Sequence, residues 1–147
     1  MPEIIRTATA TWTGDLRGGV GKASTQSGAL REVLVTFPSR FEQGEGSNPE
    51  ELIAAAHAAC FSMALSGRLT QRGIPPQEIR TRATLTLQTG EGGPRITRIH
   101  LETEARVPGA DEATFRQAAE EAKEGCPVSA LLKPGLQALT LDARLLP

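Results

Sequence analysis

Two cysteines, Cys60 and Cys126, are the residues of this sequence best suited to chemistry, and they stand far apart in the chain. Cys126 directly precedes Pro127 at the start of a predicted helical turn, where backbone N–H groups and the helix dipole favour a thiolate. A long predicted helix with a strong start signal leads into Cys60. Free cysteine is also a common core residue, so the residue types leave a packed pair open while their setting favours a thiol redox site.

His57 stands three positions before Cys60, so both side chains could face one ligand. A zinc site needs more soft ligands than two cysteines and two histidines supply, and we expect no metal. A Cys–His hydrolase would need a third group to orient the imidazole, and none is evident. The sequence therefore predicts that His57 is a packed or hydrogen-bonded helix residue.

The composition excludes several classes of protein. The 147 residues carry 16 Lys and Arg against 17 Asp and Glu, so the chain lacks the basic excess of a nucleic-acid binder. The most apolar stretch, from Leu52 to Leu65, falls short of the roughly 18 residues that span a bilayer. No targeting signal is visible, so we expect a cytoplasmic protein that binds no membrane. In that reducing compartment a cysteine pair is more often catalytic than a permanent crosslink.

The clearest element that could position these residues is a helix. Asn48 suits the N-cap, Pro49 the first helical position and Glu51 the capping box, and Gly73 marks the end after about Arg72. Apolar and small residues surround most of its axis, which predicts a buried helix.

Strands and a second helix make up the rest of the chain. Alternation of apolar and polar residues predicts strands over 4–12, about 18–26, 30–37, 79–87, 99–107 and 139–145, with a polar loop over 38–47. A helix is expected over 111–125, followed by a helical turn over 128–132. The order β-β-β-α-β-β-α-β predicts an α+β fold of antiparallel sheets around a buried central helix, in one domain over residues 1–147.

At two segments the sequence becomes recognisable. These are SNPEELIAAAHAACFSMAL, from Ser47 to Leu65, and Cys126-Pro127-Val128-Ser129. Together with Ala10-x-Trp12-x-Gly14, they closely resemble the osmotically inducible protein C / organic hydroperoxide resistance (OsmC/Ohr) family over nearly the whole chain. Ala56-His57 is similar to the osmotically inducible branch, because the other branch tends to have Gly-Tyr there.

The resemblance implies a thiol-dependent peroxidase that reduces organic hydroperoxides to alcohols in oxidative or osmotic stress defence. By position, it implies that Cys60 is the peroxidatic cysteine, which forms a sulfenic acid, and that Cys126 is the resolving cysteine, which joins it in a disulfide. Arg40 matches the arginine that stabilises thiolate and peroxide, with Arg17 as the alternative, and Glu50 matches the glutamate that orients the arginine.

The resemblance also implies an intertwined homodimer, no cofactor, and an external dithiol reductant such as a lipoyl protein. Glu50 and Cys60 are ten residues apart, which is about 15 Å along a helix and roughly 80° around it. One helix cannot bring both to a single arginine, so we expect the glutamate to come from the partner subunit. Phe61, Met63 and Leu52 near the motif favour apolar hydroperoxides. A non-catalytic binding protein on the same fold is the alternative function.

Overall fold

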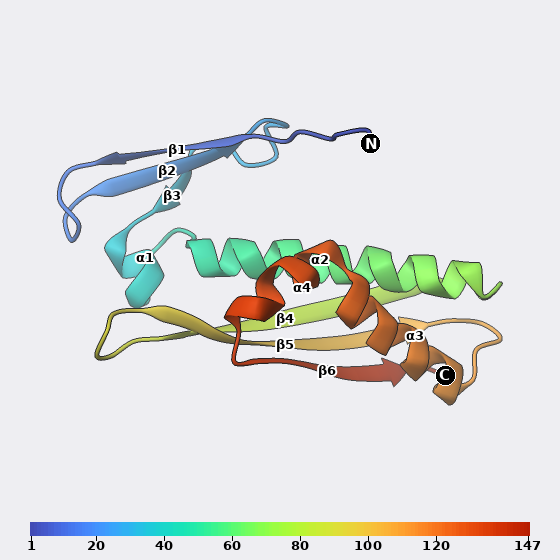
Figure 1. The fold of residues 1–147 in the computed structure, drawn as a ribbon. Helices are drawn as coiled ribbons and strands as arrows, with labels where there is room; N and C mark the ends of the chain where they lie inside the picture. Colours follow the sequence, from blue (N-terminus) through green and yellow to red (C-terminus); the bar gives the residue numbers. More distant parts are fainter. The chain divides into compact units, whose positions relative to one another are not determined.

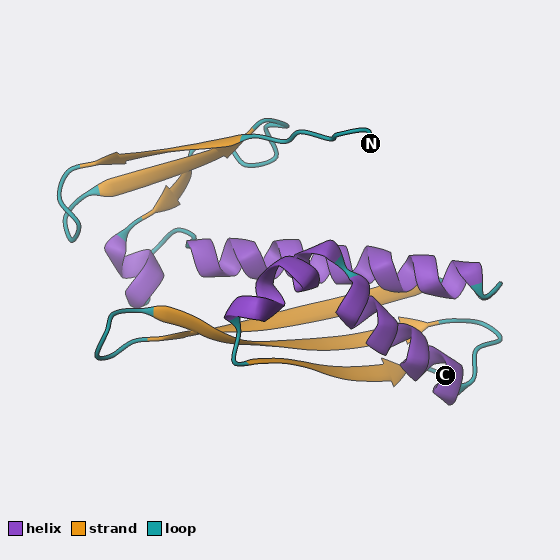
Figure 2. Cartoon of the chain, viewed as in Figure 1, coloured by secondary structure: helices purple, strands orange, loops and turns teal.

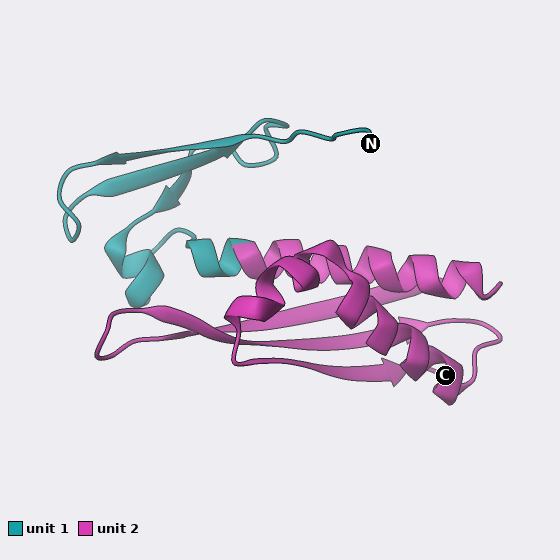
Figure 3. Cartoon of the chain, viewed as in Figure 1, with its two compact units in different colours: residues 1–52 teal, residues 53–147 magenta.

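The computed structural model describes all 147 residues and divides into two compact units, residues 1–52 and 53–147 (Figure 3). Each unit has its own sheet (Figure 2). We describe the two units separately, and the expectation of a single domain over residues 1–147 stays a prediction.

The first unit is built on a small antiparallel sheet. Its strands are β1 (Ala8–Thr13), β2 (Val20–Thr25) and β3 (Val33–Val35), in the order β1-β2-β3. The alternating pattern of residues 4–12 is typical of a strand with one buried side, but β1 is exposed along its whole length. The reason is that β1 is the edge strand of a single sheet layer, which leaves Trp12 44 % exposed.

A short helix, α1 (Phe37–Phe41), stands where the sequence predicts the end of a strand and a polar loop. Thr36 and Ser39 form a reciprocal capping box: each side-chain oxygen accepts a hydrogen bond from the other residue's backbone N–H. Pro38 near the start of the helix has no N–H to leave unsatisfied. These local bonds end β3 at Val35 and turn the chain towards Arg40.

The long helix, α2 (Pro49–Gln71), has the predicted bounds to within one residue. The Asn48 side chain accepts a hydrogen bond from the Glu51 N–H at 2.8 Å, and Gly73 follows the helix end with a φ of +75°. The face that is buried repeats every fourth residue, from His57 through Phe61 to Leu69.

The opposite face of α2 corrects the expectation of a helix buried all round. It is exposed and consists of small or apolar residues: Ala55, Ala56, Ala59, Met63 and Gly67. No helix or strand of the second unit covers this stripe, and Met63 is 77 % exposed.

The length of α2 also corrects the expectation that the most apolar stretch of the chain is too short to span a bilayer. With 23 residues and a mean hydropathy of 1.3 in its most apolar window, the helix is long and apolar enough, by length and composition, to cross a bilayer. The core helix of a globular domain passes the same test, and Phe61 and Leu65 of α2 are packed in such a core.

The second unit is a three-stranded sheet with helices on one face (Figure 1). Its strands are β4 (Glu78–Gln88), β5 (Arg95–Arg106) and β6 (Ala138–Leu145). β4 and β5 form the predicted antiparallel hairpin. The core includes Leu65 of α2, Leu101 of β5 and Phe115 of α3 (Glu112–Gly125), all fully buried.

The pairing of the last strand differs from the predicted antiparallel sheet, because β6 runs parallel to β5. Parallel neighbours need a crossover connection, and here α3, α4 (Pro127–Leu132) and the 3₁₀ turn η1 (Lys133–Gly135) supply it. The amphipathic pattern of α3 predicts the helix but carries no signal for the direction in which the chain returns.

Candidate active site

The structure brings Cys60 and Cys126 together in the second unit. Their Sγ atoms are 2.7 Å apart, both thiols are free, and Cys126 is fully buried while Cys60 is partly exposed. A disulfide bond is about 2.05 Å long, so the two sulfurs are within reach of a covalent bond with only a small movement. The predicted proximity of the two sulfurs is confirmed.

Cys126 is held at a break between two helices. It is both the C-cap of α3 and the N-cap of α4, with extended backbone angles of φ −61° and ψ 129°. Pro127 disfavours helical geometry at the preceding residue, so the chain changes direction at the cysteine. The Cys126 N–H donates to the Ala122 carbonyl, and the Cys126 carbonyl accepts from the Ala130 N–H. These two bonds hold the backbone of Cys126 and leave its side chain free to rotate.

The surroundings of Cys60 work mainly against its ionisation. Burial raises the pKa of the Cys60 thiol, and the hydrogen-bonded Cys126 thiol raises it further, because two thiolates at this distance would repel. The Val128 N–H acts in the opposite direction and lowers the pKa. The start of α4 therefore favours the thiolate form of Cys60, whereas the sequence predicts this effect for Cys126.

His57 lies one turn before Cys60 and forms a buried hydrogen bond. Its Nε2 is 2.7 Å from the Ser129 Oγ on α4, and both residues are fully buried. The other ring nitrogen, Nδ1, has no partner. Burial lowers the pKa of His57, which favours the neutral ring. The prediction of a hydrogen-bonded helix residue is confirmed, and Ser129 is the partner that the sequence did not identify.

Arg40 and Glu50 pair within the first unit of one chain. The Arg40 Nη2 and Nε donate to Glu50 Oε1 at 2.7 and 3.0 Å, and Nε also reaches Oε2 at 3.3 Å. Glu50 is only 7 % exposed. Arg17 makes no ion pair and lies 4.6 Å over the ring of Phe37. Of the two candidate arginines, Arg40 is therefore the one that a carboxylate orients.

An apolar hollow of about 540 Å³ lies beside Arg40 in the first unit. Aromatic and aliphatic side chains dominate its lining: Trp12, Leu16, Val35, Phe37 and Phe41. The sequence favours Phe61 as an apolar residue near the chemistry, but Phe61 is fully buried in the core of the second unit. The sequence does not predict the residues that line this hollow, because they come from three separate segments of the chain.

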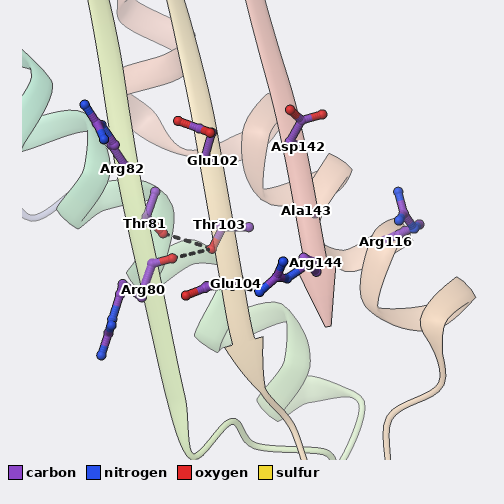
Figure 4. Close-up of a pocket in the computed structure, with 10 residues that line it drawn as sticks. All are labelled: Arg80, Thr81, Arg82, Glu102, Thr103, Glu104, Arg116, Asp142, Ala143 and Arg144. Carbon is purple, nitrogen blue, oxygen red and sulfur yellow. Dashed lines mark hydrogen bonds and ion pairs between the residues drawn. The ribbon is translucent and has the colours of Figure 1, made fainter. Parts of the chain in front are cut away.

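A second hollow, over the exposed side of the second sheet, has a different character (Figure 4). Charges of both signs alternate there across the strands, with Arg80, Glu104 and Arg144 side by side in the register. It holds no cysteine or histidine, so it offers nothing for thiol chemistry. No group of three or more His, Cys, Asp or Glu side chains is placed to hold a metal ion.

Comparisons with known proteins identify the family of the chain. The family described as OsmC-like protein matches residues 42–138, which include α2 and both cysteines. The chain belongs to the OsmC family. It is 47 % identical to Peroxiredoxin OsmC of Escherichia coli (strain K12), over 97 % of each chain.

Other members of the OsmC family are more distant. The organic hydroperoxide resistance protein of Xanthomonas axonopodis pv. citri (strain 306) is 33 % identical, over 86 % of this chain and 87 % of that one. The crystal structure of an OsmC-like protein from Mycoplasma pneumoniae has a TM-score of 0.77 over 99 % of this chain and all of that chain, at 15 % identity. The identities place this chain in the osmotically inducible branch, and the structural likeness supports the α+β OsmC-like fold.

Proposed function

We propose that this protein is a cysteine-based peroxidase that reduces organic hydroperoxides to alcohols. The observation that carries the proposal is the pair of free thiols, Cys60 and Cys126, with their sulfurs 2.7 Å apart. The 47 % identity to Peroxiredoxin OsmC supports it, because that identity extends over almost the whole chain.

The proposed cycle has three balanced steps. The Cys60 thiolate attacks the O–O bond of the hydroperoxide, takes one oxygen as a sulfenic acid, and releases an alkoxide that gains a proton to become the alcohol. The Cys126 thiol then attacks the sulfenic sulfur, forming the disulfide and releasing water. An external dithiol reduces that disulfide by thiol–disulfide exchange and is itself oxidised.

Arg40 is assigned to the first step. A free thiol with a pKa of about 8.5 is a few per cent ionised at neutral pH, so full ionisation would gain only tens-fold in rate over such a thiol. Burial raises the pKa of Cys60, so its surroundings within one chain do not supply even this gain. The larger gain must come from fixed donors that align the peroxide and stabilise the departing alkoxide. Glu50 occupies the Nε and Nη2 side of Arg40, which fixes the guanidinium plane and leaves Nη1 as the donor for that task.

The proposal places the complete site in a homodimer. Arg40 and Glu50 pair within one chain, and Cys60 follows Glu50 on the same helix by about 15 Å of helical rise. The Cys60 of one subunit therefore needs the Arg40–Glu50 pair of the other. The exposed stripe on α2, with Met63 at its centre, supports such an interface because small residues let a second helix approach closely.

The apolar hollow beside Arg40 supports a preference for apolar hydroperoxides over hydrogen peroxide. We further propose a dithiol of the lipoyl type as reductant and a cytoplasmic role in the defence against oxidative or osmotic stress. These assignments rest on the resemblance of the chain to its family.

Counting free thiols tests the proposal. Reduced protein is mixed with tert-butyl hydroperoxide, and the thiols are titrated over time. We expect the wild type to lose two thiols rapidly and the Cys126→Ser variant to stop at a sulfenic acid on Cys60, which dimedone traps.

Two outcomes of this experiment oppose the proposal. Slow loss of both thiols, at the rate of an ordinary exposed cysteine, would indicate a non-catalytic binding protein. Absence of free thiols before peroxide is added, in protein prepared under reducing conditions, would indicate a structural disulfide.

A further inference from the structure

The hydrogen bond between His57 and Ser129 has no part in the cycle described above, although it lies next to both thiols. His57 precedes Cys60 by one helical turn on α2, and Ser129 follows Cys126 by one turn on α4. Both side chains are fully buried, and His57 Nε2 and Ser129 Oγ are 2.7 Å apart. The two helices are therefore joined by two parallel contacts, one between sulfurs and one between polar side chains.

We propose that His57 and Ser129 are positioning residues for the resolving step, because their hydrogen bond holds α4 at the distance at which Cys126 can attack the oxidised Cys60. This inference rests on the proposed function. It adds a role for two residues that neither attack the peroxide nor form the disulfide.

The short helix α4 needs such a tether. It has six residues, and a helix of that length is marginal without tertiary contacts. Its N-cap, Cys126, makes no side-chain cap hydrogen bond, so the sulfur is free to react but does not fix the helix. The bond from Ser129 to His57 is a directional contact to a long helix whose neighbouring residues are packed in the core.

The demand on this tether is greatest after the first step. The oxygen added to Cys60 occupies space near the Cys126 sulfur, which is 2.7 Å away in the reduced state. Cys126 must nevertheless approach within about 2.05 Å of the Cys60 sulfur to form the disulfide. Leu132 packs the far end of α4 against the core, and the His57 bond anchors the helix one turn beyond Cys126, which keeps the attacking sulfur near this path.

An acid–base or charge role does not fit the same histidine. Burial lowers the pKa of His57 and so disfavours the imidazolium that would be needed to stabilise the Cys60 thiolate. Nε2 is occupied by Ser129, and Nδ1 has no hydrogen-bond partner. A neutral imidazole with one occupied nitrogen acts through direction and distance, which is the property that a tether requires.

The experiment measures the two chemical steps separately in single turnovers with tert-butyl hydroperoxide. The first step is the oxidation of Cys60, and the second is the loss of the dimedone-reactive sulfenic acid as the disulfide forms. Ser129→Ala and His57→Leu each remove the hydrogen bond from one side. We expect the second step to slow about tenfold in both, the typical effect of losing one buried hydrogen bond, with the first step within twofold of the wild type.

Two further variants serve as a conservative replacement and as a matched control. His57→Gln places an amide, which can donate or accept, near the position of Nε2, and we expect it to restore most of the rate of the second step. Ser62→Ala is the matched control, because it also removes a hydroxyl hydrogen bond from α2, the 2.8 Å contact with Thr81 of β4. We expect Ser62→Ala to leave both steps unchanged.

Three results would overturn the inference: both steps unchanged in Ser129→Ala, both steps slowed in parallel, or a second step equally slow in His57→Gln and His57→Leu. Should His57→Leu fail to fold, Ser129→Ala carries the test, since it deletes a single oxygen. Failure of the proposed function looks different, because the wild type itself would then form no sulfenic acid with the peroxide.

Discussion

Replacing Arg40 with lysine tests whether the shape of the guanidinium group, rather than its charge, supports peroxide reduction. Arg40 meets Glu50 through two nitrogens, with N···O distances of 2.7, 3.0 and 3.3 Å. A lysine keeps the positive charge but has one nitrogen, which the nearly buried carboxylate would attract. The planar fork that leaves Nη1 as a fixed donor is lost.

The expected magnitude follows from the bonds that Arg40→Lys removes. A hydrogen bond between charged groups contributes about 1.5–3 kcal/mol. The Arg40 side chain is 37 % exposed, so the lower part of this range applies, about 2 kcal/mol. If the lost bonds are those that hold the donor in the transition state, about 2 kcal/mol corresponds to a rate about 30-fold lower.

The assay is the second-order rate constant for Cys60 oxidation by cumene hydroperoxide in a single turnover. Arg17→Lys is the matched control, because Arg17 contacts an aromatic ring but no carboxylate, and we expect a change below twofold. A rate for Arg40→Lys within threefold of the wild type would refute the reasoning. A larger loss in Arg17→Lys than in Arg40→Lys would assign the role to Arg17.

Three further predictions concern assembly and pH. Met63→Glu places a charge on the exposed apolar stripe of α2 and should shift the proposed dimer to a monomer in sedimentation. Met63→Leu should leave the sedimentation unchanged. A dimer that persists in Met63→Glu would exclude this stripe as the dimer interface. The pKa of Cys60 is raised in the folded state, so its contribution to stability is present below about pH 8.5 and is lost at higher pH. The free energy of unfolding should therefore fall more steeply with alkaline pH in the reduced wild type than in Cys60→Ser. The lowered pKa of His57 gives the opposite pH dependence: its contribution to stability is present above about pH 6.5 and is lost as the pH falls. The free energy of unfolding by urea should therefore decrease less at acidic pH in His57→Gln than in the wild type. An equal decrease in both proteins would contradict the assignment.

The parts of the fold that local patterns determine could be predicted from the sequence. Asn48, Pro49 and Gly73 predict the ends of α2 because capping and chain termination depend on neighbouring residues. The alternation of β4 and β5 likewise predicts a hairpin with one covered face. Helix α1 carried a local signal as well, the Thr36–Ser39 capping box, but serine at the third helical position is less typical there than glutamate or glutamine.

Features that depend on distant contacts could not be predicted in the same way. The parallel direction of β6 results from the path of α3 and α4 across the sheet, which no residue of β6 encodes. The sequence predicts that the exposed side of α2 is core, because a face of small and apolar residues has the same composition whether or not its own sheet covers it.

The candidate site shows the same division. The pairing of Cys60 with Cys126 followed from recognisable motifs, and the hydrogen bond of His57 follows from its place on a buried helix face. Its partner, Ser129, is separated from it by 72 positions, and no local pattern connects the two.

The crossover that carries Cys126 also sets an order of events during biosynthesis. Because β6 pairs in parallel with β5, a crossover over residues 107–137 joins them, and this crossover brings Cys126 out of the ribosome after Cys60. A ribosome-bound chain that has exposed Cys60 but not yet Cys126 has no neighbour for that sulfur. An oxidant that reaches the unfinished polypeptide meets an unpaired thiol, which places the nascent chain, rather than the finished protein, at risk of irreversible over-oxidation.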